Sequence, residues 1–374
     1  MRAYQQCKRC VMDTVADPYI TFDENGFCNH CNFYFKERAP RVYRGEQSKQ
    51  KLSELVATIK KSGEGKKYDC VIAFSGGVDS SYVAYLAKKL GLRALLVHID
   101  NEWNTAIAEE NIKRVVEKLG FDFYRYKVDW DEFKDLQLSF LKASVPEAET
   151  PTDIALPAVW HQVAAEHGVK YILSGGNFIT EGIKPKWWHY DPKDYKYIRA
   201  IQKQFGTKEL KSFPVFDYKA EAYYKFIKGI RIIYFLNYAD YKPDEALQTL
   251  VSEVGFQYYE HKHYESIYTK FIQAYYLPVK FNIDYRKATY SSKICSGIMT
   301  RDEALAMLQQ KTYTEQELEE WKSLLCQKFE ISRSELEEIL ARPPKFYYDY
   351  PNNKAFLEFI YSTYRLLKKL RLLK

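Results

Sequence analysis

Residues 68–81 run Tyr-Asp-Cys-Val-Ile-Ala-Phe-Ser-Gly-Gly-Val-Asp-Ser-Ser. The first half, Tyr68–Phe74, is a short and mostly apolar run, which is typical of a strand buried on both faces of a sheet. The second half, Ser75–Ser81, is a turn rich in glycine and hydroxyl groups. Apolar residues then recur at helical spacing up to Gly91, namely Val83, Leu86, Ala87 and Leu90. A buried strand, a glycine-rich turn and an amphipathic helix therefore follow one another directly.

The same alternation of strand and helix continues along the chain. Further strands are expected at 92–99, 121–128 and 169–174, with a helical stripe through Ile112 and Leu119 and a helix near 155–167. Strands that alternate with helices at this spacing form a parallel sheet with helices on its faces. The sequence therefore predicts the α/β class, with a parallel sheet that carries helices on both faces.

The chain has 374 residues, enough for two to three domains at about 150 residues each. We expect a small cysteine module at 1–45, the sheet domain at 50–220 and a mainly helical C-terminal region at 221–374. Hydroxyl residues followed three positions later by Glu predict helix starts in that last region, at Thr300, Thr314 and Ser332.

Composition narrows the class of protein. No apolar run approaches the 18 or so residues that a membrane span needs, and the first ten residues lack an apolar signal segment. Seven cysteines without such a segment favour a reducing compartment, so we expect a cytoplasmic protein. The net charge of +7 is compatible with an anionic substrate but does not require nucleic acid.

The turn after the first strand is suited to a phosphate group. Glycines let the backbone approach an anion closely and adopt positive φ, hydroxyls add donors, and the next helix offers free N–H groups. A carboxylate beside phosphates is repulsive, so we assign Asp79 to Mg²⁺ or to orienting the turn. The residues expected to bind a phosphate or pyrophosphate group here are Ser75, Gly76, Gly77, Asp79, Ser80 and Ser81.

Ligands of such sheets lie outside the carboxyl ends of the strands. Segments that follow the other strands should therefore converge on Asp79. His98 and Asp100 follow the second strand, and Gly175 lies in a second glycine-rich turn after the fourth strand. Together with Asp79, Asn177 and Glu181 are the expected catalytic residues.

Two cysteine pairs lie near the N-terminus, and each has the spacing of a metal-binding knuckle. Four thiolates in this pattern suit a structural Zn²⁺ site, with an iron–sulfur cluster as a minor alternative. The ligands are Cys7, Cys10, Cys28 and Cys31. Cys70, Cys295 and Cys326 are isolated in sequence and are expected to be buried small hydrophobes.

The turn resembles the PP-loop of the N-type ATP pyrophosphatases (adenine nucleotide alpha hydrolase-like), which cleave ATP to AMP and pyrophosphate. The resemblance implies that the residues of the turn bind ATP together with Gly175, and that His98 and Asp100 lie on the adenine and ribose side. Most of the chain resembles the N-acetyl sugar amidotransferase family of bacterial surface-polysaccharide (lipopolysaccharide O-antigen) and nonulosonic-acid (pseudaminic acid) pathways. Besides the knuckles and the PP-loop, the resemblance rests on stretches 129–137, 142–146, 180–183, 236–240, 262–265 and 276–281, with Asp284 and Arg286. One departure is Thr289-Tyr290, where a His-Leu pair is expected.

The resemblance implies that ATP adenylates the oxygen of a sugar acetamido group and that ammonia replaces it, giving an acetamidino sugar. No glutaminase motif is present in the sequence, so ammonia is expected from a separate HisH-like glutaminase, with a HisF-like cyclase-type subunit. A nucleotide-linked sugar is the expected substrate. Its candidate binding residues are Lys184, Trp187, His263, Tyr264, Glu265 and Arg286, although Trp187 and Trp188 could equally close a domain interface.

Two other functions remain open at this point. PP-loops joined to zinc knuckles also occur in tRNA-modifying enzymes, and interleaved Lys and Tyr would suit RNA. Thiolation needs reactive cysteines near ATP, however, and only the solitary Cys70 and Cys295 are available. A non-catalytic nucleotide-sensing module is the weaker alternative.

Overall fold

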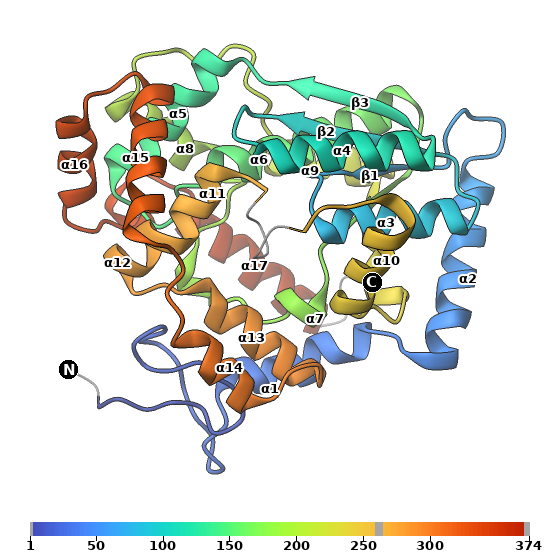
Figure 1. Ribbon diagram of the computed structural model, residues 1–374, viewed down its shortest axis with the longest axis horizontal. Coiled ribbons are helices and arrows are strands. Elements are labelled where there is room, and N and C mark those ends of the chain that lie inside the picture. Colours follow the sequence, from blue (N-terminus) through green and yellow to red (C-terminus); the bar gives the residue numbers. More distant parts are fainter. Residues whose placement is uncertain (1–2, 259–264, 370–374) are drawn as a thin grey trace.

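The computed structural model describes residues 3–258 and 265–369. Its centre is a five-stranded sheet in the order β3-β2-β1-β4-β5, with every neighbouring pair parallel (Figure 1). The strands are β1 (Cys70–Ala73), β2 (Ala94–Asp100), β3 (Asp122–Lys127), β4 (Tyr171–Ser174) and β5 (Arg231–Tyr234). The predicted parallel α/β sheet is confirmed.

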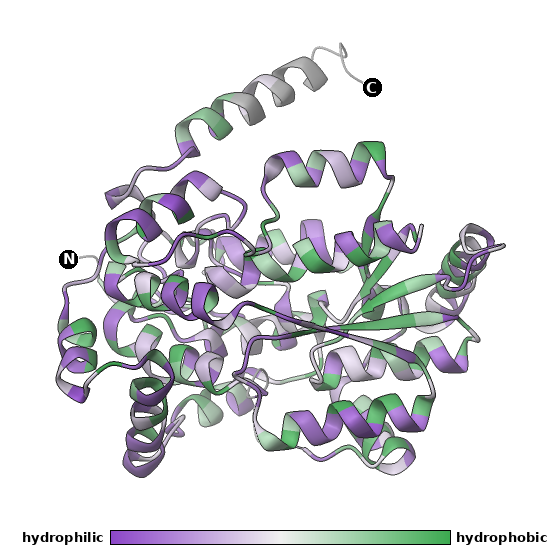
Figure 2. Cartoon of the chain, turned by 90° about the horizontal axis from the view of Figure 1, so that it is seen from above, coloured by the Kyte–Doolittle hydropathy of each residue, from purple (hydrophilic) through white to green (hydrophobic). Residues whose placement is uncertain are grey.

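Helices cover both faces of the sheet, as Figure 2 shows from above. In β1, Val71 and Ala73 belong to one apolar core and Cys70 and Ile72 to the other, because successive side chains of a strand point to opposite faces. One core is formed with α2 (Gly45–Ser62), α3 (Val78–Lys89), α4 (Ala106–Leu119) and α10 (Pro243–Val254). The other is formed with α5 (Trp130–Ala143), α6 (Thr150–Glu166) and α8 (Tyr195–Phe205). Burial on both faces explains the apolar run at 70–74.

The sequence prediction finds one of the two edge strands and misses the other. The segment 121–128 is a strand as expected, but β3 is largely exposed because it has a neighbour on one side only. The other edge strand, β5, was not predicted, and it continues the sheet beyond residue 220, the predicted end of the sheet domain. β5 has only four residues and lies in an aromatic-rich segment, so the sequence pattern does not distinguish it as a strand.

Short helices and a helical C-terminal part complete the fold. The other α-helices are α1 (Asn29–Phe33), α7 (Phe178–Glu181), α9 (Tyr218–Ala222), α11 (Ile267–Phe271), α12 (Leu277–Phe281), α13 (Tyr285–Ser296), α14 (Arg301–Leu308), α15 (Glu315–Phe329), α16 (Arg333–Ala341) and α17 (Lys354–Lys369). Short 3-10 or π segments are η1 (Tyr34–Arg38), η2 (Ala39–Arg41), η3 (Lys186–Trp188), η4 (Tyr223–Ile227), η5 (Phe235–Tyr238), η6 (Ile272–Tyr276) and η7 (Tyr347–Asp349).

Helix caps in the C-terminal part follow the predicted pattern. Thr300 with Glu303 and Thr314 with Glu317 form reciprocal capping boxes, whereas Ser332 accepts a hydrogen bond from the Glu335 N–H. Within the described ranges, none of the helices combines the length and the apolar character needed to pass through a lipid bilayer.

Candidate active site

The turn between β1 and α3 has the geometry of an anion-binding loop. Gly76 has φ of +84°, and a β-carbon there would lie 2.6 Å from Cγ1 of Ile112, so only glycine fits. Gly77 begins α3 in an extended conformation, with φ of −77° rather than the positive φ expected for both glycines. No side chain caps this helix, so its first N–H groups face the turn and favour a negatively charged ligand.

Hydroxyl groups brace the turn from inside. The Ser75 and Ser80 Oγ atoms lie 3.1 Å apart, Ser80 Oγ accepts from the Ser75 N–H, and Ser75 Oγ accepts from the Gly77 N–H. Ser81 points into the interior, where its hydroxyl is buried without a hydrogen-bond partner. Ser75 and Ser80 therefore lie in the loop itself, whereas Ser81 lies behind it.

Asp79, in the first turn of α3, is held by two side chains from distant segments. Asn177 Nδ2 donates to Asp79 Oδ2 over 3.2 Å, and the Tyr241 hydroxyl donates to Oδ1. Burial, and then the charge of Asp79, raise the pKa of Tyr241, so it remains a neutral donor. Asn177 was expected here, whereas Tyr241 was missed because nothing local in its sequence marks it.

The turn after β4 lies against the start of α3. A β-carbon on Gly175 would lie 2.8 Å from the Ser80 nitrogen and 2.9 Å from the Asp79 carbonyl carbon, so this glycine permits backbone contact. Asn177 begins α7, and its Oδ1 accepts from the Thr180 N–H. Glu181 ends α7 with an exposed side chain whose charge raises the pKa of Tyr241. The structure thus brings together the three expected catalytic residues.

His98 and Asp100 lie on the expected side of the loop but are engaged within the protein. Buried His98 has Nδ1 at 3.0 Å from the Phe74 carbonyl and Nε2 at 3.0 Å from Asn104 Nδ2. Burial lowers the pKa of His98, which favours the neutral ring. Asp100 accepts from the Glu102 N–H and from Arg125. His98 therefore fixes the backbone at the start of the PP-loop.

The four N-terminal cysteines converge on one point. Their Sγ atoms lie within 4.8 Å of one another, and all four residues are fully buried. The pairs Cys7–Cys31 and Cys10–Cys28 lie 3.9 and 3.7 Å apart, close to the spacing of about 3.8 Å that tetrahedral Zn–S bonds of about 2.3 Å produce. Backbone N–H groups point at the sulfur atoms of Cys7, Cys10 and Cys28. The donor set fits Zn²⁺.

Sequence spacing missed a fifth thiol beside this cluster. Cys295, on α13, donates to Cys31 Sγ over 3.6 Å and is buried. His30, in contrast, pairs with Asp17 over 2.6 Å and takes no part in the cluster. Of the cysteines expected to be isolated, Cys70 is buried in β1, and burial raises the pKa of its thiol.

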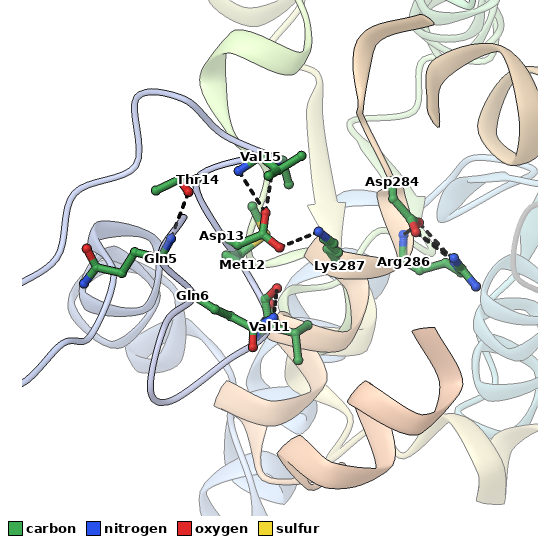
Figure 3. A network of polar contacts seen from close by, with 12 residues as sticks. Gln5, Gln6, Val11, Met12, Asp13, Thr14, Val15, Asp284, Arg286 and Lys287 are labelled. Atoms are coloured by element: carbon green, nitrogen blue, oxygen red, sulfur yellow. Dashed lines mark hydrogen bonds and ion pairs between the residues drawn. The ribbon is translucent and has the colours of Figure 1, made fainter. Parts of the chain in front are cut away.

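The cysteine module is fastened to α13 and α14, next to which it lies in Figure 1. Figure 3 shows Lys287 in an ion pair of 2.5 Å with buried Asp13. Arg301 donates to the carbonyls of Cys7 and Cys10. Farther along α13, Ser292 Oγ accepts from the Ile183 N–H, just beyond α7. A continuous set of contacts therefore runs from the cysteines through α13 to α7.

The residues expected on the substrate side do not form one group. Arg286 pairs with Asp284 over 2.7 Å (Figure 3) and donates to the Gln310 carbonyl. Trp187 lies near Tyr19 and Phe346, and Trp188 donates to the Ala16 carbonyl, so both rings lie at the interface with the N-terminal module. His263 and Tyr264 lie outside the described residues.

Lys184 and Glu265 occupy two different places. Lys184 lines a cavity of about 250 Å³ together with residues of the α5–α6 connection. The Glu265 carbonyl accepts from the Thr105 N–H, which places Glu265 beside the segment that follows β2, and its Oε2 atom is buried without a hydrogen bond. Thr289 and Tyr290 lie on α13, with Tyr290 buried.

Two family models match the chain, one over the segment that contains the phosphate loop and one over the C-terminal part. Residues 67–176 match the asparagine synthase model, and residues 265–371 match the model described as "LPS biosynthesis protein WbpG-like, C-terminal domain". Both matches support the resemblance to the N-acetyl sugar amidotransferase family. Together, the two matches support an ATP-dependent PP-loop amidotransferase that is connected with lipopolysaccharide biosynthesis.

The individual proteins that resemble this chain share only a low sequence identity with it. The uncharacterized protein MJ1599 of Methanocaldococcus jannaschii is 27% identical over 231 residues, covering 60% of this chain and 73% of that protein. NMN synthetase from Francisella tularensis is 14% identical, with a TM-score of 0.30 over 59% of this chain and 100% of that chain. A "predicted subunit of tRNA methyltransferase" from M. jannaschii is 20% identical, with a TM-score of 0.27 over 49% and 74%. These two structural similarities are too loose to indicate function.

Proposed function

We propose that this protein adenylates the acetamido oxygen of a nucleotide-linked N-acetyl sugar and replaces that oxygen with nitrogen from ammonia. The products are an acetamidino sugar, AMP and pyrophosphate. The observation that carries the proposal is the PP-loop with Asp79 fixed by Asn177 and Tyr241, in a chain whose C-terminal part matches the WbpG-like model. Such a sugar would serve lipopolysaccharide O-antigen or a nonulosonic acid such as pseudaminic acid.

The reaction needs two displacements. The amide oxygen attacks the α-phosphorus of ATP, and pyrophosphate leaves toward the N–H groups at the start of α3. Ammonia then adds to the activated carbon, AMP leaves with the former amide oxygen, and one proton is released. Glu181, exposed at the end of α7, is the proposed proton acceptor. The site contributes position and charge neutralisation.

Two metal ions are part of the proposal. Mg²⁺ usually binds through one or two carboxylates together with phosphate oxygens, and Asp79 is the carboxylate at the loop that fits this role. Mg²⁺ would supply positive charge to the phosphates. Zn²⁺ would be held by Cys7, Cys10, Cys28 and Cys31, and since four thiolates leave no open position, its role is structural.

Ammonia is proposed to come from a separate HisH-like glutaminase, delivered with a HisF-like cyclase-type subunit. The sequence lacks a glutaminase elbow. The tRNA-thiolation alternative loses support because, among the described residues, Cys70 is buried in β1 and Cys295 lies at the cysteine cluster.

The test uses purified protein, ATP, ammonium chloride and a panel of nucleotide-linked acetamido sugars. Sugar-dependent pyrophosphate release is expected, with a product lighter by the difference between an oxygen atom and an NH group. An isotopic label in the amide oxygen should appear in AMP. Pyrophosphate release that depends on tRNA, or a label that never reaches AMP, would contradict the proposal.

A further inference from the structure

A polar cavity of about 250 Å³ lies beside α7, in a part of the molecule that the phosphate loop does not use. Its wall includes Glu147 and Glu149 from the connection between α5 and α6, and Asp153 from the first turn of α6. Lys184 and His189 line it from the segment after α7. Helix α6 leads into β4 and runs antiparallel to the strands, so its first turn lies on the side of their carboxyl ends.

Two polar atoms of this wall are buried without a hydrogen bond. Glu147 is 5% exposed, its Oε2 accepts from the Tyr197 hydroxyl over 3.1 Å, and its Oε1 has no partner. His189 Nδ1 is also buried and unpartnered. Proteins rarely leave buried polar atoms unsatisfied, so each such atom indicates a group that is supplied from elsewhere. Here both atoms belong to residues that line one cavity.

The connection that carries the two glutamates is held rigidly. The Tyr276 hydroxyl donates to the Val145 carbonyl and the Tyr268 hydroxyl donates to the Ala148 carbonyl, each over 3.1 Å. Gln273 donates to Glu149 Oε2 over 3.0 Å. The carboxylates are therefore positioned in advance, which lowers the entropic cost of binding a ligand.

The acidic groups of this cavity do not gather around one point. Among the residues that the structure describes, the cysteine quartet is the only set of three or more possible metal ligands whose atoms converge. The unpartnered oxygen of Glu147 and nitrogen of His189 therefore suit a ligand with several separate polar groups. Tyr190 and Tyr285 supply aromatic surface to the same wall, which suits the C–H faces of a sugar ring.

We propose that this cavity binds the pyranose ring of the acceptor sugar, whose hydroxyl groups donate hydrogen bonds to Glu147 and Glu149. The inference rests on the proposed function, because it concerns the substrate of the same reaction. A volume of about 250 Å³ is below the roughly 300–1,000 Å³ of complete ligand pockets, so one ring enters and the nucleotide stays outside. Lys184, exposed at the mouth, then meets the diphosphate.

The geometry links this cavity to the phosphate loop through α7. Asn177 at the start of α7 contacts Asp79, and Lys184 follows Glu181, the last residue of α7, after Gly182 and Ile183. A ring in the cavity would thus place its acetamido group on the side of Glu181. Burial raises the pKa of Glu147 and of Glu149 to about 7, so both can accept or donate hydrogen bonds near neutral pH.

The inference can be tested by measuring the binding of sugar probes directly, without following the reaction. Saturation-transfer NMR with N-acetylglucosamine and with UDP-N-acetylglucosamine is expected to detect both probes on the full-length protein. At pH 8, where both carboxyls are mainly ionised, Glu147→Gln and Glu149→Gln should each weaken the binding of both probes about tenfold, because a carboxylate accepts a hydroxyl hydrogen bond more strongly than a neutral amide does. Lys184→Met should weaken the UDP-linked probe alone, and the matched control Lys186→Met, on η3, should change neither.

The outcomes separate this inference from the proposed function. ATP binding and the melting temperature of each variant show whether the fold and the phosphate loop are intact. Glutamine variants that fold and bind both probes like the wild type overturn the inference, as does a wild-type protein that binds neither probe. Sugar binding that depends on the two glutamates, without any pyrophosphate release, would instead support the cavity and contradict the proposed function.

Discussion

Asn177 connects two parts of the site with one side chain: its Oδ1 accepts from the Thr180 N–H at the start of α7, and its Nδ2 donates to Asp79. The orientation of the Asp79 carboxylate is therefore coupled to the position of α7. Since α7 also carries Glu181 and leads to Lys184, the phosphate loop and the sugar cavity share one structural support.

Exchanging Asn177 separates its two roles. Asn177→Asp keeps an oxygen that can cap α7 but replaces the donor to Asp79 by a second carboxylate, so we expect a folded protein with pyrophosphate release lowered at least about tenfold. Asn177→Ala also removes the cap, which should cost about 1 kcal/mol of stability. Thermal unfolding and pyrophosphate assays on both variants check this. Wild-type activity in Asn177→Asp would contradict a positioning role.

Tyr241 is expected to matter through its hydroxyl alone. Tyr241→Phe removes the hydrogen bond to Asp79 and keeps the ring, whose centroid lies 5.8 Å from that of Tyr82. The rate of pyrophosphate release should fall about tenfold, with a small change in the melting temperature. The matched control is Tyr82→Phe, which removes the hydroxyl of the neighbouring ring and leaves the hydrogen bond from Tyr241 to Asp79 in place. Equal effects of the two variants would contradict the prediction.

Removing a cysteine of the quartet should act on stability before catalysis. Cys7→Ser is expected to lose bound zinc and to lower the melting temperature by several degrees, because metal binding contributes to folding. The effect should reach α7, since α13 contacts both the cysteine module and Ile183. Metal analysis by mass spectrometry and thermal unfolding measure it, with Cys326→Ser on α15 as the control. The prediction would be contradicted if the wild-type protein contained no zinc, or if removing its zinc left the melting temperature unchanged.

Much of this arrangement could be predicted from sequence, for identifiable reasons. The apolar run at 70–74 and the glycine turn are local signals, and the topology of parallel sheets brings the turn after β4 toward Asp79. The cysteine spacing is likewise local. These patterns involve residues that are close together in the chain, so they can be recognised in a single sequence.

The remainder depends on contacts between distant segments. Tyr241 lies 162 residues from Asp79, and Cys295 lies 264 residues from Cys31, so no local spacing relates them. The edge strand β5 buries little apolar surface, which removes the pattern that identifies the central strands. Glu147 and Glu149 stand in a short connection, where their burial follows only from the tyrosines of α11 and η6 that hold it.

The stability of the protein should depend on pH through Glu147. Burial raises the pKa of Glu147 to about 7, whereas an unfolded Glu titrates near about 4.3. Between these values the folded protein holds a proton that the unfolded chain releases, so this group's contribution is full below about pH 4 and is lost as the pH rises through about 7. The titratable groups that contact Glu147 or share its cavity are Tyr197, Tyr190, Tyr285, His189, Lys184, Glu149 and Asp153.

Glu147→Gln removes that titration. We expect the melting temperature of the variant, relative to the wild type, to increase between about pH 5 and pH 8, because only the wild type must ionise a buried carboxyl. Thermal unfolding over this pH range measures the difference. Parallel pH profiles of the two proteins would contradict the buried titration of Glu147.

Gly175 and Gly176 are neighbours whose exchange for alanine should have unequal effects. The β-carbon of Gly175→Ala would lie 2.8 Å from the Ser80 nitrogen and 2.9 Å from the Asp79 carbonyl carbon, and both are backbone atoms at the start of α3. That of Gly176→Ala would meet the Tyr234 ring at 3.1 Å, and this ring is 48% exposed and can move. Because backbone cannot yield without displacing the PP-loop, we expect Gly175→Ala to lose about 1–3 kcal/mol of stability, as overpacking typically does, and most ATP binding. Gly176→Ala should keep both. Chemical denaturation and ATP titration compare the two variants, and equal losses would show that the turn after β4 does not set the position of Asp79.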